Sequence, residues 1–362
     1  MQKEIECQIK RGKDSMGRKA RVGLTRDFFD EDGKFIMPGP GLKLLDNMPN
    51  VEYEMFPEFL REVTPGQIEG FDMVCSFRPL WTKQSIAGNE QLISIHRGGV
   101  GYERLDVPAL TKAGIMLFIT PRAVRRPMAV VYMTFILALS MRLLTKDKLI
   151  REGRWGEQYH YQGYGLVGRT LGSIGVGNIG HEMCLLAKPF GMKHIAYDPY
   201  TTQEAVSDVD VKLVDLDTVL AESDLLCVIC PLNEETRHMI GEKELRKMKK
   251  TAFLINAARG PIVDETALIK ALQEGWIRGA GLDVFEQEPV SPDNPLLKMD
   301  NVILSPHALA QTDQTFSTMW EIIAEQTAAI IHGEVPETLV NREVLDSSEM
   351  KAKLKKFHEA IK

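Results

Sequence analysis

Short runs of apolar and β-branched residues alternate with segments of helical periodicity along most of the chain. This alternation is typical of parallel α/β architecture, in which helices follow strands and cover the sheet. One group of predicted strands lies at residues 20–25, 51–56, 71–77, 91–97 and 115–120, and a second at 171–176, 193–197, 225–229, 252–256, 279–284 and 302–305. The pattern therefore predicts two sheets.

A long apolar stretch, "PMAVVYMTFILALSMRLL", separates the two groups and begins at Pro127. Because proline is favoured at the first position of a helix, we expect a helix to begin there. Its uncharged part, Met128 to Met141, is shorter than the roughly 20 residues that span a bilayer, which favours a buried or dimer-forming helix. Further helices are predicted over 313–332 and, as an amphipathic C-terminal segment, over 347–362.

Length and composition narrow the class of protein. A chain of 362 residues exceeds what one hydrophobic core supports, so two domains are expected. A net charge of −6 gives no reason to expect a nucleic-acid or membrane partner. The N-terminal residues lack the apolar region of a signal peptide. The five cysteines, an odd number, predict reduced thiols and a cytoplasmic location.

Two cysteines, Cys227 and Cys230, have the C-x-x-C spacing of redox dithiols. Redox pairs lie at helix N-termini, whereas this pair lies in an extended apolar run that ends at Pro231. We therefore interpret it as part of a buried strand. No metal site is predicted.

A glycine-rich segment, "SIGVGNIGHE", follows the predicted strand at 171–176 and opens a helix. Gly175, Gly177 and Gly180 have G-x-G-x-x-G spacing, which permits a tight turn, approach of a pyrophosphate to the backbone, and close packing of helix on strand. Asp198, 18 residues further on, is placed to bind ribose hydroxyls, and no Arg or Lys follows it in "DPYTTQEA". The segment predicts binding of NAD rather than NADP; the alternative is a purely structural turn.

Three further strand ends carry ionisable residues. Arg259 follows the strand at 252–256. Asp283 lies at the end of the strand at 279–284, and Glu288 comes five residues later. His307 follows "VILSP". Ligands of parallel α/β sheets bind outside the carboxyl ends of the strands, so these side chains are expected to converge. An arginine fork can hold a carboxylate, and a histidine supported by a carboxylate can exchange a proton. Singly, each residue is as well explained by a surface ion pair or a turn.

These motifs resemble those of the D-isomer-specific 2-hydroxyacid dehydrogenase family over most of the chain, most strongly from Arg151 to Thr312. "LGSIGVGNIG", "LINAARGPIVDE", "GLDVFEQEP" and "SPH" occur in the family's order. The resemblance implies NAD-dependent hydride transfer to or from a D-2-hydroxy acid, with Arg259, Glu288 and His307 as the catalytic residues. It also implies cofactor contacts at Gly175, Gly177, Asn178, Ile179, Gly180, Asp198, Pro231, Ala257, Arg259, Asp283 (to the nicotinamide amide) and His307.

The same resemblance implies two doubly wound domains with a cleft between them, and a homodimer that forms through the cofactor domain. The flavodoxin-like substrate domain would comprise residues 1–123 and 312–362, and the Rossmann NAD-binding domain residues 124–311.

A second glycine-rich segment, "IHRGGVGYERLDV", resembles the family's substrate loop. It implies substrate contacts at Arg97, Gly98, Gly99 and Val100, together with Arg259 and His307. Successive N–H groups at Gly98, Gly99 and Gly101 could wrap a carboxylate. The alternative is a plain turn before a helix over 104–113.

Several positions near the expected substrate depart from the family pattern: Ile119, Arg122, Tyr132, Ile229 and Leu309. The first unit also carries arginines near strand ends, at positions 78, 97, 122, 125 and 126. We consider two hypotheses for them: binding of a sugar acid, dicarboxylate or phosphorylated acid, or ordinary surface ion pairs.

Two other functions fit the motifs. An NAD-responsive, corepressor-like binding protein could retain the same residues on the same fold. Hydride chemistry on formate or phosphite is a further option, and Glu288 argues against the formate enzymes, which are expected to have glutamine at this position.

Overall fold

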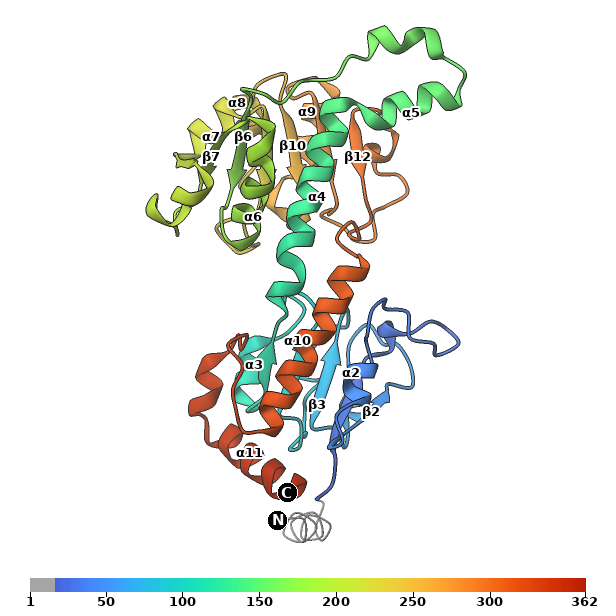
Figure 1. The fold of residues 1–362 in the computed structure, drawn as a ribbon, viewed down its shortest axis with the longest axis vertical. Helices are drawn as coiled ribbons and strands as arrows, with labels where there is room; N and C mark the ends of the chain where they lie inside the picture. Colours follow the sequence, from blue (N-terminus) through green and yellow to red (C-terminus); the bar gives the residue numbers. More distant parts are fainter. Residues whose placement is uncertain (1–16) are drawn as a thin grey trace, which may run out of the picture. The chain divides into compact units, whose positions relative to one another are not determined.

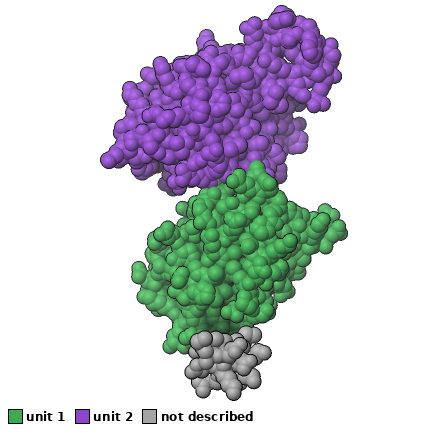
Figure 2. Space-filling view, in the orientation of Figure 1, with its two compact units in different colours: residues 1–124, 312–362 green, residues 125–311 purple. Residues whose placement is uncertain are grey.

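The computed structural model describes residues 17–362 and divides the chain into two compact units (Figure 2). Unit 1 comprises residues 1–124 and 312–362, and unit 2 residues 125–311. Cys7 and most of the N-terminal segment considered above lie outside the described residues. Each unit is built on one parallel sheet with helices around it, which confirms the predicted fold class (Figure 1).

The sheet of unit 1 has the strand order β2-β1-β3-β4-β5, and all its strands are parallel. Its strands are β1 (Ala20–Leu24), β2 (Val51–Met55), β3 (Met73–Ser76), β4 (Ser94–Arg97) and β5 (Met116–Phe118). This is the flavodoxin-type order, in which the connections reverse direction between β1 and β3. Each strand overlaps one predicted from the apolar runs.

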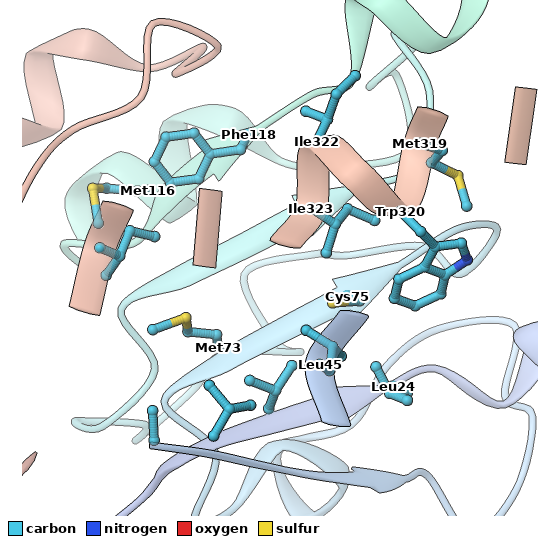
Figure 3. Close-up of a cluster of buried hydrophobic side chains, with 14 of the residues drawn as sticks. Leu24, Leu45, Met73, Cys75, Met116, Phe118, Met319, Trp320, Ile322 and Ile323 are labelled. Atoms are coloured by element: carbon cyan, nitrogen blue, oxygen red, sulfur yellow. The ribbon is translucent and has the colours of Figure 1, made fainter. Parts of the chain in front are cut away.

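The described helices that lie entirely within unit 1 are α2 (Lys43–Asp46), α3 (Val107–Lys112), α10 (Asp313–Ile331) and α11 (Ser348–Ile361). Trp320 and Ile323 of α10 pack against Leu24 and Cys75 of the strands, in a core that Figure 3 shows. Helix α3 begins later than predicted because Asp106 accepts a hydrogen bond from the Ala109 N–H and so acts as its N-cap.

The sheet of unit 2 has the order β12-β11-β10-β9-β6-β7-β8, again parallel throughout. Its strands are β6 (Thr170–Ile174), β7 (Lys193–Tyr197), β8 (Val211–Leu213), β9 (Leu225–Val228), β10 (Phe253–Asn256), β11 (Gly279–Leu282) and β12 (Val302–Leu304). The reversal between β6 and β9 is the switch point of a dinucleotide-binding sheet. The apolar runs of the sequence do not predict β8, a three-residue edge strand.

The helices of unit 2 are α5 (Leu143–Arg151), α6 (Asn178–Ala187), α7 (Leu216–Glu222), α8 (Glu242–Lys247) and α9 (Glu265–Gln273), together with most of α4 (Pro121–Met141). Two apolar clusters cover the two faces of the sheet. The boundary between the units lies within α4.

Helix α4 begins at Pro121, so the prediction that Pro127 opens it was wrong. Both prolines are acceptable helix starts, but the turn between them is also helical, and Arg125 and Arg126 form ion pairs with Glu182 that stabilise it. Among the described residues α4 is the one helix whose length and composition would allow it to cross a membrane. Half of its apolar window is buried, and Phe135 and Ile136 pack in the unit 2 core, as in core helices of globular proteins.

Candidate functional site

The glycine loop joins β6 to α6. Gly175 has φ +92°, a left-handed conformation that favours glycine, and a Cβ there would lie 3.0 Å from the Cys230 nitrogen. A Cβ on Gly180 would lie 3.0 Å from the Gly175 oxygen, so close packing of helix on loop requires this glycine. A Cβ on Gly177, the N-cap of α6, would meet no atom within 4 Å. The space at Gly177 thus fits the pyrophosphate of a dinucleotide at a helix N-terminus.

Asp198, directly after β7, lies against this loop. Its Oδ2 accepts a hydrogen bond from the Val176 N–H over 2.9 Å, and its Oδ1 accepts one from the Tyr200 N–H over 2.9 Å. The carboxylate is therefore fixed at the end of β7, where an adenosine ribose lies in dinucleotide-binding folds. The two predicted contacts at the start of α6, Asn178 and Ile179, are exposed and partly buried, respectively.

The next strand end, after β9, carries Cys230 and Pro231. Pro231 is exposed, and its carbonyl accepts a hydrogen bond from Thr236 Oγ1 over 2.7 Å. Burial raises the pKa of Cys230 to about 11, and Cys227 lies fully buried in β9. Both are free thiols, which agrees with their interpretation as strand residues rather than a redox pair.

Arg259 lies in the loop after β10, and hydrogen bonds from Asn256 hold this loop in place. The buried side chain of Asn256 donates to the Arg259 carbonyl over 2.9 Å and accepts from the Ala258 N–H over 3.1 Å. Ala257, a predicted cofactor contact, is buried within this loop. A Cβ on Gly260 would lie 1.9 Å from the Phe285 oxygen, so the loops after β10 and β11 touch there. Asn256 was not among the predicted site residues, although a polar amide at the end of an apolar strand could have indicated it.

His307 and Glu288 are joined directly: Nδ1 of His307 lies 2.8 Å from Oε2 of Glu288. Their side chains are 47% and 31% exposed, so the pair lies at the surface of unit 2. Oε1 of Glu288 accepts the Phe285 N–H over 3.1 Å. Burial opposes ionisation of Glu288, but the hydrogen bond and charge of His307, the Phe285 N–H and the charge of Arg259 outweigh it and lower its pKa.

Asp283 stabilises the turn that contains His307. It is 2% exposed, and its Oδ1 accepts hydrogen bonds from the N–H groups of Ala308 and Leu309 over 3.1 and 3.3 Å. His307 itself has φ +54°, an uncommon conformation for a residue other than glycine. Such conformations gather at functional sites, where the surrounding structure holds them. The contact of Asp283 with a nicotinamide amide stays a prediction.

The substrate loop of unit 1 follows β4, which ends at Arg97. The Arg97 guanidinium lies over the Phe77 ring, 5.8 Å from its centre. The Gly98 N–H donates to the Ser76 carbonyl over 2.9 Å and the Gly99 N–H to Thr120 Oγ1 over 2.6 Å. The N–H groups of Gly98 and Gly99 therefore already have acceptors within unit 1, and the substrate contacts expected at this loop stay a prediction.

Most of the strand-end arginines form ion pairs. Arg122 pairs with Glu325 over 2.8 Å, and Arg125 and Arg126 pair with Glu182. Arg78 lies 3.5 Å from the buried carboxylate of Asp27. For these residues the structure favours the surface ion-pair hypothesis over a role with a polyanionic substrate.

The residues that depart from the family pattern are buried or partly buried in the structure, apart from Arg122 described above. The phenol of Tyr132 is buried and donates to the Val228 carbonyl over 2.5 Å, at the end of β9. Ile119, Ile229 and Leu309 are all partly buried, and the last two pack against a core cluster of unit 2.

Known proteins that are similar in sequence belong to the family that the motifs resemble. Residues 133–308 match the model of the D-isomer specific 2-hydroxyacid dehydrogenase NAD binding domain. The chain is 38% identical to a glyoxylate reductase of Thermofilum pendens, over 86% of this chain and 94% of that protein. A glyoxylate reductase of Korarchaeum cryptofilum is 46% identical over 68% of this chain and 75% of its own length.

Solved structures give the same result. The D-lactate dehydrogenase of Aquifex aeolicus, complexed with NAD and lactic acid, has a TM-score of 0.77 at 26% identity, covering 88% of this chain and 99% of that one. These relatives lend no support to a corepressor-like function. Homology and the glycine loop agree on the cofactor, which is NAD. The chain belongs to the D-isomer specific 2-hydroxyacid dehydrogenase family, and it is an NAD-dependent oxidoreductase that acts on 2-hydroxy acids and their 2-keto partners.

Proposed function

We propose that the protein reduces glyoxylate or a closely related small 2-keto acid, with His307, Glu288 and Arg259 as its catalytic residues. The observation that carries the proposal is the hydrogen-bonded pair of His307 and Glu288 near Arg259. The choice of glyoxylate is supported by relatives of that name, among them the enzymes of Thermofilum pendens and Thermococcus litoralis, at 38% and 39% identity.

In this proposal each residue has one task. Arg259 binds the substrate carboxylate with its guanidinium fork and polarises the keto oxygen. NADH, when bound, supplies the hydride that reduces the carbonyl carbon. Because Nδ1 of His307 is bonded to Glu288, Nε2 is the atom that gives its proton to the forming alkoxide. The negative charge of Glu288 stabilises the protonated imidazole before that transfer.

We also propose that unit 2 binds the cofactor and that unit 1 contributes contacts to the substrate. Unit 2 binds NAD through Gly175, Gly177, Asn178, Ile179 and Gly180, with further contacts from Asp198, Pro231, Ala257 and Asp283. The match of residues 133–308 to an NAD binding domain supports this. Unit 1 contributes Arg97, Gly98, Gly99 and Val100 to substrate binding, a role supported by the position of Arg97 at the carboxyl end of β4.

The test is a spectrophotometric screen of 2-keto acids with NADH, including glyoxylate, hydroxypyruvate and pyruvate. We expect turnover of glyoxylate, a loss of about 10²–10⁴ in kcat for His307→Ala, and a raised KM for Arg259→Lys and Arg97→Met. Full turnover by His307→Ala would refute the acid–base assignment. Bound NADH without turnover of any acid would refute the substrate class.

We further propose that the protein is a homodimer that forms through α4, α5 and the segment after them. Large apolar side chains are exposed along this stretch, including Leu143, Ile150, Trp155 at 69% and Tyr159 at 76%. Figure 1 shows α5 and the following chain extending away from the unit 2 sheet. Exposed apolar surface of this kind marks interaction sites.

The oligomeric state can be measured by light scattering coupled to size-exclusion chromatography. We expect a dimer for the native chain and a monomer for the double variant Ile150→Asp, Trp155→Glu; a native monomer would contradict the proposal. A cytoplasmic location is also proposed, supported by the four free cysteines among the described residues. Fractionation of cells of the source organism tests it.

A further inference from the structure

The ladder between β9 and β10 ends early, at the edge of the unit 2 sheet that carries the proposed catalytic residues. In parallel strands every second residue donates a hydrogen bond to the neighbouring strand. The Phe253 N–H donates to the Asp224 carbonyl over 3.0 Å, so the same spacing makes Ala257, four residues later, a donor. Its acceptor would be Val228, four residues after Asp224. Within residues 17–362 the Ala257 N–H does not form this bond.

The strand pairs on either side continue further. Beyond β6 and β9, the Ile229 N–H donates to the Ile174 carbonyl over 2.9 Å. Beyond β10 and β11, the Asp283 N–H donates to the Asn256 carbonyl over 3.0 Å. Among these three neighbouring pairs, the interruption is therefore confined to β9 and β10.

The hydroxyl of Tyr132 fills the interruption. It donates to the Val228 carbonyl over 2.5 Å, and the Ala257 backbone donates to the same hydroxyl oxygen. Tyr132 is 1% exposed, and burial is the main cause that raises its pKa, so the hydroxyl keeps its proton for Val228. One buried oxygen thus replaces the missing ladder bond, and it holds the two strand ends further apart than a direct bond would.

Helix α4 fixes the place of this hydroxyl. Tyr132 and Phe135 lie on the face of α4 that packs on the sheet (Figure 1), in one apolar cluster with Cys227 of β9 and Ile255 of β10. A Cβ on Gly281 of β11 would lie 2.6 Å from the Phe135 ring, so helix and sheet are in close contact. The ring of Tyr132 is therefore held by packing, and its hydroxyl acts as a spacer of fixed position.

We propose that Tyr132 is a positioning residue whose hydroxyl sets the separation of the loops after β9 and β10 and, through it, the position of the Arg259 guanidinium. This inference rests on the proposed role of Arg259 in binding the substrate carboxylate. Ala257 begins the loop and lies two residues before Arg259. The bonds of Asn256 to Ala258 and Arg259 make the loop a stiff unit, so a displacement of Ala257 also displaces Arg259.

The test substitution is Tyr132→Phe, which removes one oxygen and keeps the ring. A displacement of about 1 Å near a reacting substrate can cost roughly 10² in rate, so kcat/KM for glyoxylate should fall by at least about tenfold. In the Arg259→Lys background the same substitution should change kcat/KM by less than about threefold, because the arginine that Tyr132 positions is absent. Equal fold losses in both backgrounds would show a general structural role and overturn the proposal.

The matched control is Ser223→Ala. The Ser223 hydroxyl is fully buried in unit 2, donates to the Val219 carbonyl, and precedes β9 at the opposite edge of the sheet. Loss of this hydrogen bond should lower the melting temperature, as in Tyr132→Phe, but should leave kcat/KM within about twofold of the native value. A loss of kcat/KM equal to that of Tyr132→Phe would overturn the proposal.

The hydrogen bond itself is tested by amide hydrogen exchange of the NADH-saturated protein, measured at Ala257 by mass spectrometry. In Tyr132→Phe the remaining ring keeps the Ala257 N–H away from Val228, so we expect exchange at least about tenfold faster than in the native protein and in Ser223→Ala. Unchanged exchange would overturn the proposal. If the native protein turns over no 2-keto acid, the proposed function fails, and the exchange rate still decides whether Tyr132 holds this loop.

Discussion

His307 and Glu288, 19 residues apart in sequence, are linked by a 2.8 Å contact between Nδ1 and Oε2. The pKa of Glu288 is lowered although the group is partly buried, so the carboxylate is ionised at neutral pH. An ionised carboxylate on one ring nitrogen fixes the orientation of the imidazole and leaves the other nitrogen, Nε2, for a substrate.

The charge of Glu288 can be removed while its shape is kept. In Glu288→Gln the amide oxygen can still accept the Nδ1 proton, but the protonated imidazole loses its electrostatic partner. We expect kcat for keto-acid reduction to fall by roughly 10² at neutral pH, and the pH–rate profile to move to lower pH. A profile that stays in place, measured by stopped-flow at saturating NADH, would show that the charge of Glu288 does not support the proton transfer.

The turn that presents His307 depends on Asp283. Asp283→Ala leaves the N–H groups of Ala308 and Leu309 without their acceptor, which costs about 1–3 kcal/mol for buried groups. Asp283→Asn retains an oxygen acceptor at Oδ1 and should lose less. Denaturant unfolding and kcat should rank native, Asn and Ala in that order, and equal stability of Asn and Ala would contradict the bracing role.

Two glycines of the cofactor loop should respond differently to alanine. A Cβ on Gly177 meets no protein atom within 4 Å, so Gly177→Ala should lower the melting temperature less than Gly180→Ala does, and it should weaken NADH binding by at least about tenfold. A Cβ on Gly180 meets the Gly175 oxygen at 3.0 Å, so Gly180→Ala should also lower the melting temperature. Calorimetry and NADH fluorescence titration measure the two effects. Unchanged NADH affinity in Gly177→Ala would place the cofactor elsewhere.

Coenzyme preference should depend on the charge of Asp198. Asp198→Asn keeps one side-chain oxygen, which can still accept the Val176 N–H, but removes the charge that repels a 2′-phosphate. We expect the ratio of kcat/KM for NADH to that for NADPH to fall at least about tenfold. If the ratio does not change in steady-state assays with both coenzymes, Asp198 does not select NAD.

Unit 1 contains a buried histidine that predicts acid sensitivity. His96 bonds to Ser94 and Gln326, and burial lowers its pKa to about 4. Its ordinary pKa, near 6.5, applies in the unfolded chain. The neutral ring therefore contributes its full stability above pH 6.5, and that stability is lost as the pH falls toward 4. The slope should approach 1.4 kcal/mol per pH unit.

The matched variant is His96→Gln, which does not titrate. We expect it to be less stable than the native protein at pH 7 and to show a flatter decline between pH 6.5 and 4.5 in urea unfolding. An identical decline in both proteins would assign the acid sensitivity to other groups.

Local sequence was sufficient for the features that depend on near neighbours. A strand buried on both faces reads as a continuous apolar run, so most strands of both sheets could be predicted. The glycine spacing and the polar residues at strand ends were likewise visible, because a parallel sheet places those ends along one edge. The short edge strand β8 was missed, since its three residues, one of them Lys212, carry little apolar signal.

Tertiary structure decided the features whose partners are distant in sequence. Glu182 forms ion pairs with Arg125 and Arg126, and Glu325 forms one with Arg122. These arginines, which the sequence offered as possible substrate ligands, are therefore paired within the protein. The Ser76 carbonyl accepts a hydrogen bond from the Gly98 N–H, and the Thr120 hydroxyl accepts one from the Gly99 N–H. A linear pattern records which groups a chain contains and where its backbone turns. Which donor meets which acceptor depends on chain segments brought together only by folding, and so the sequence alone could not decide it.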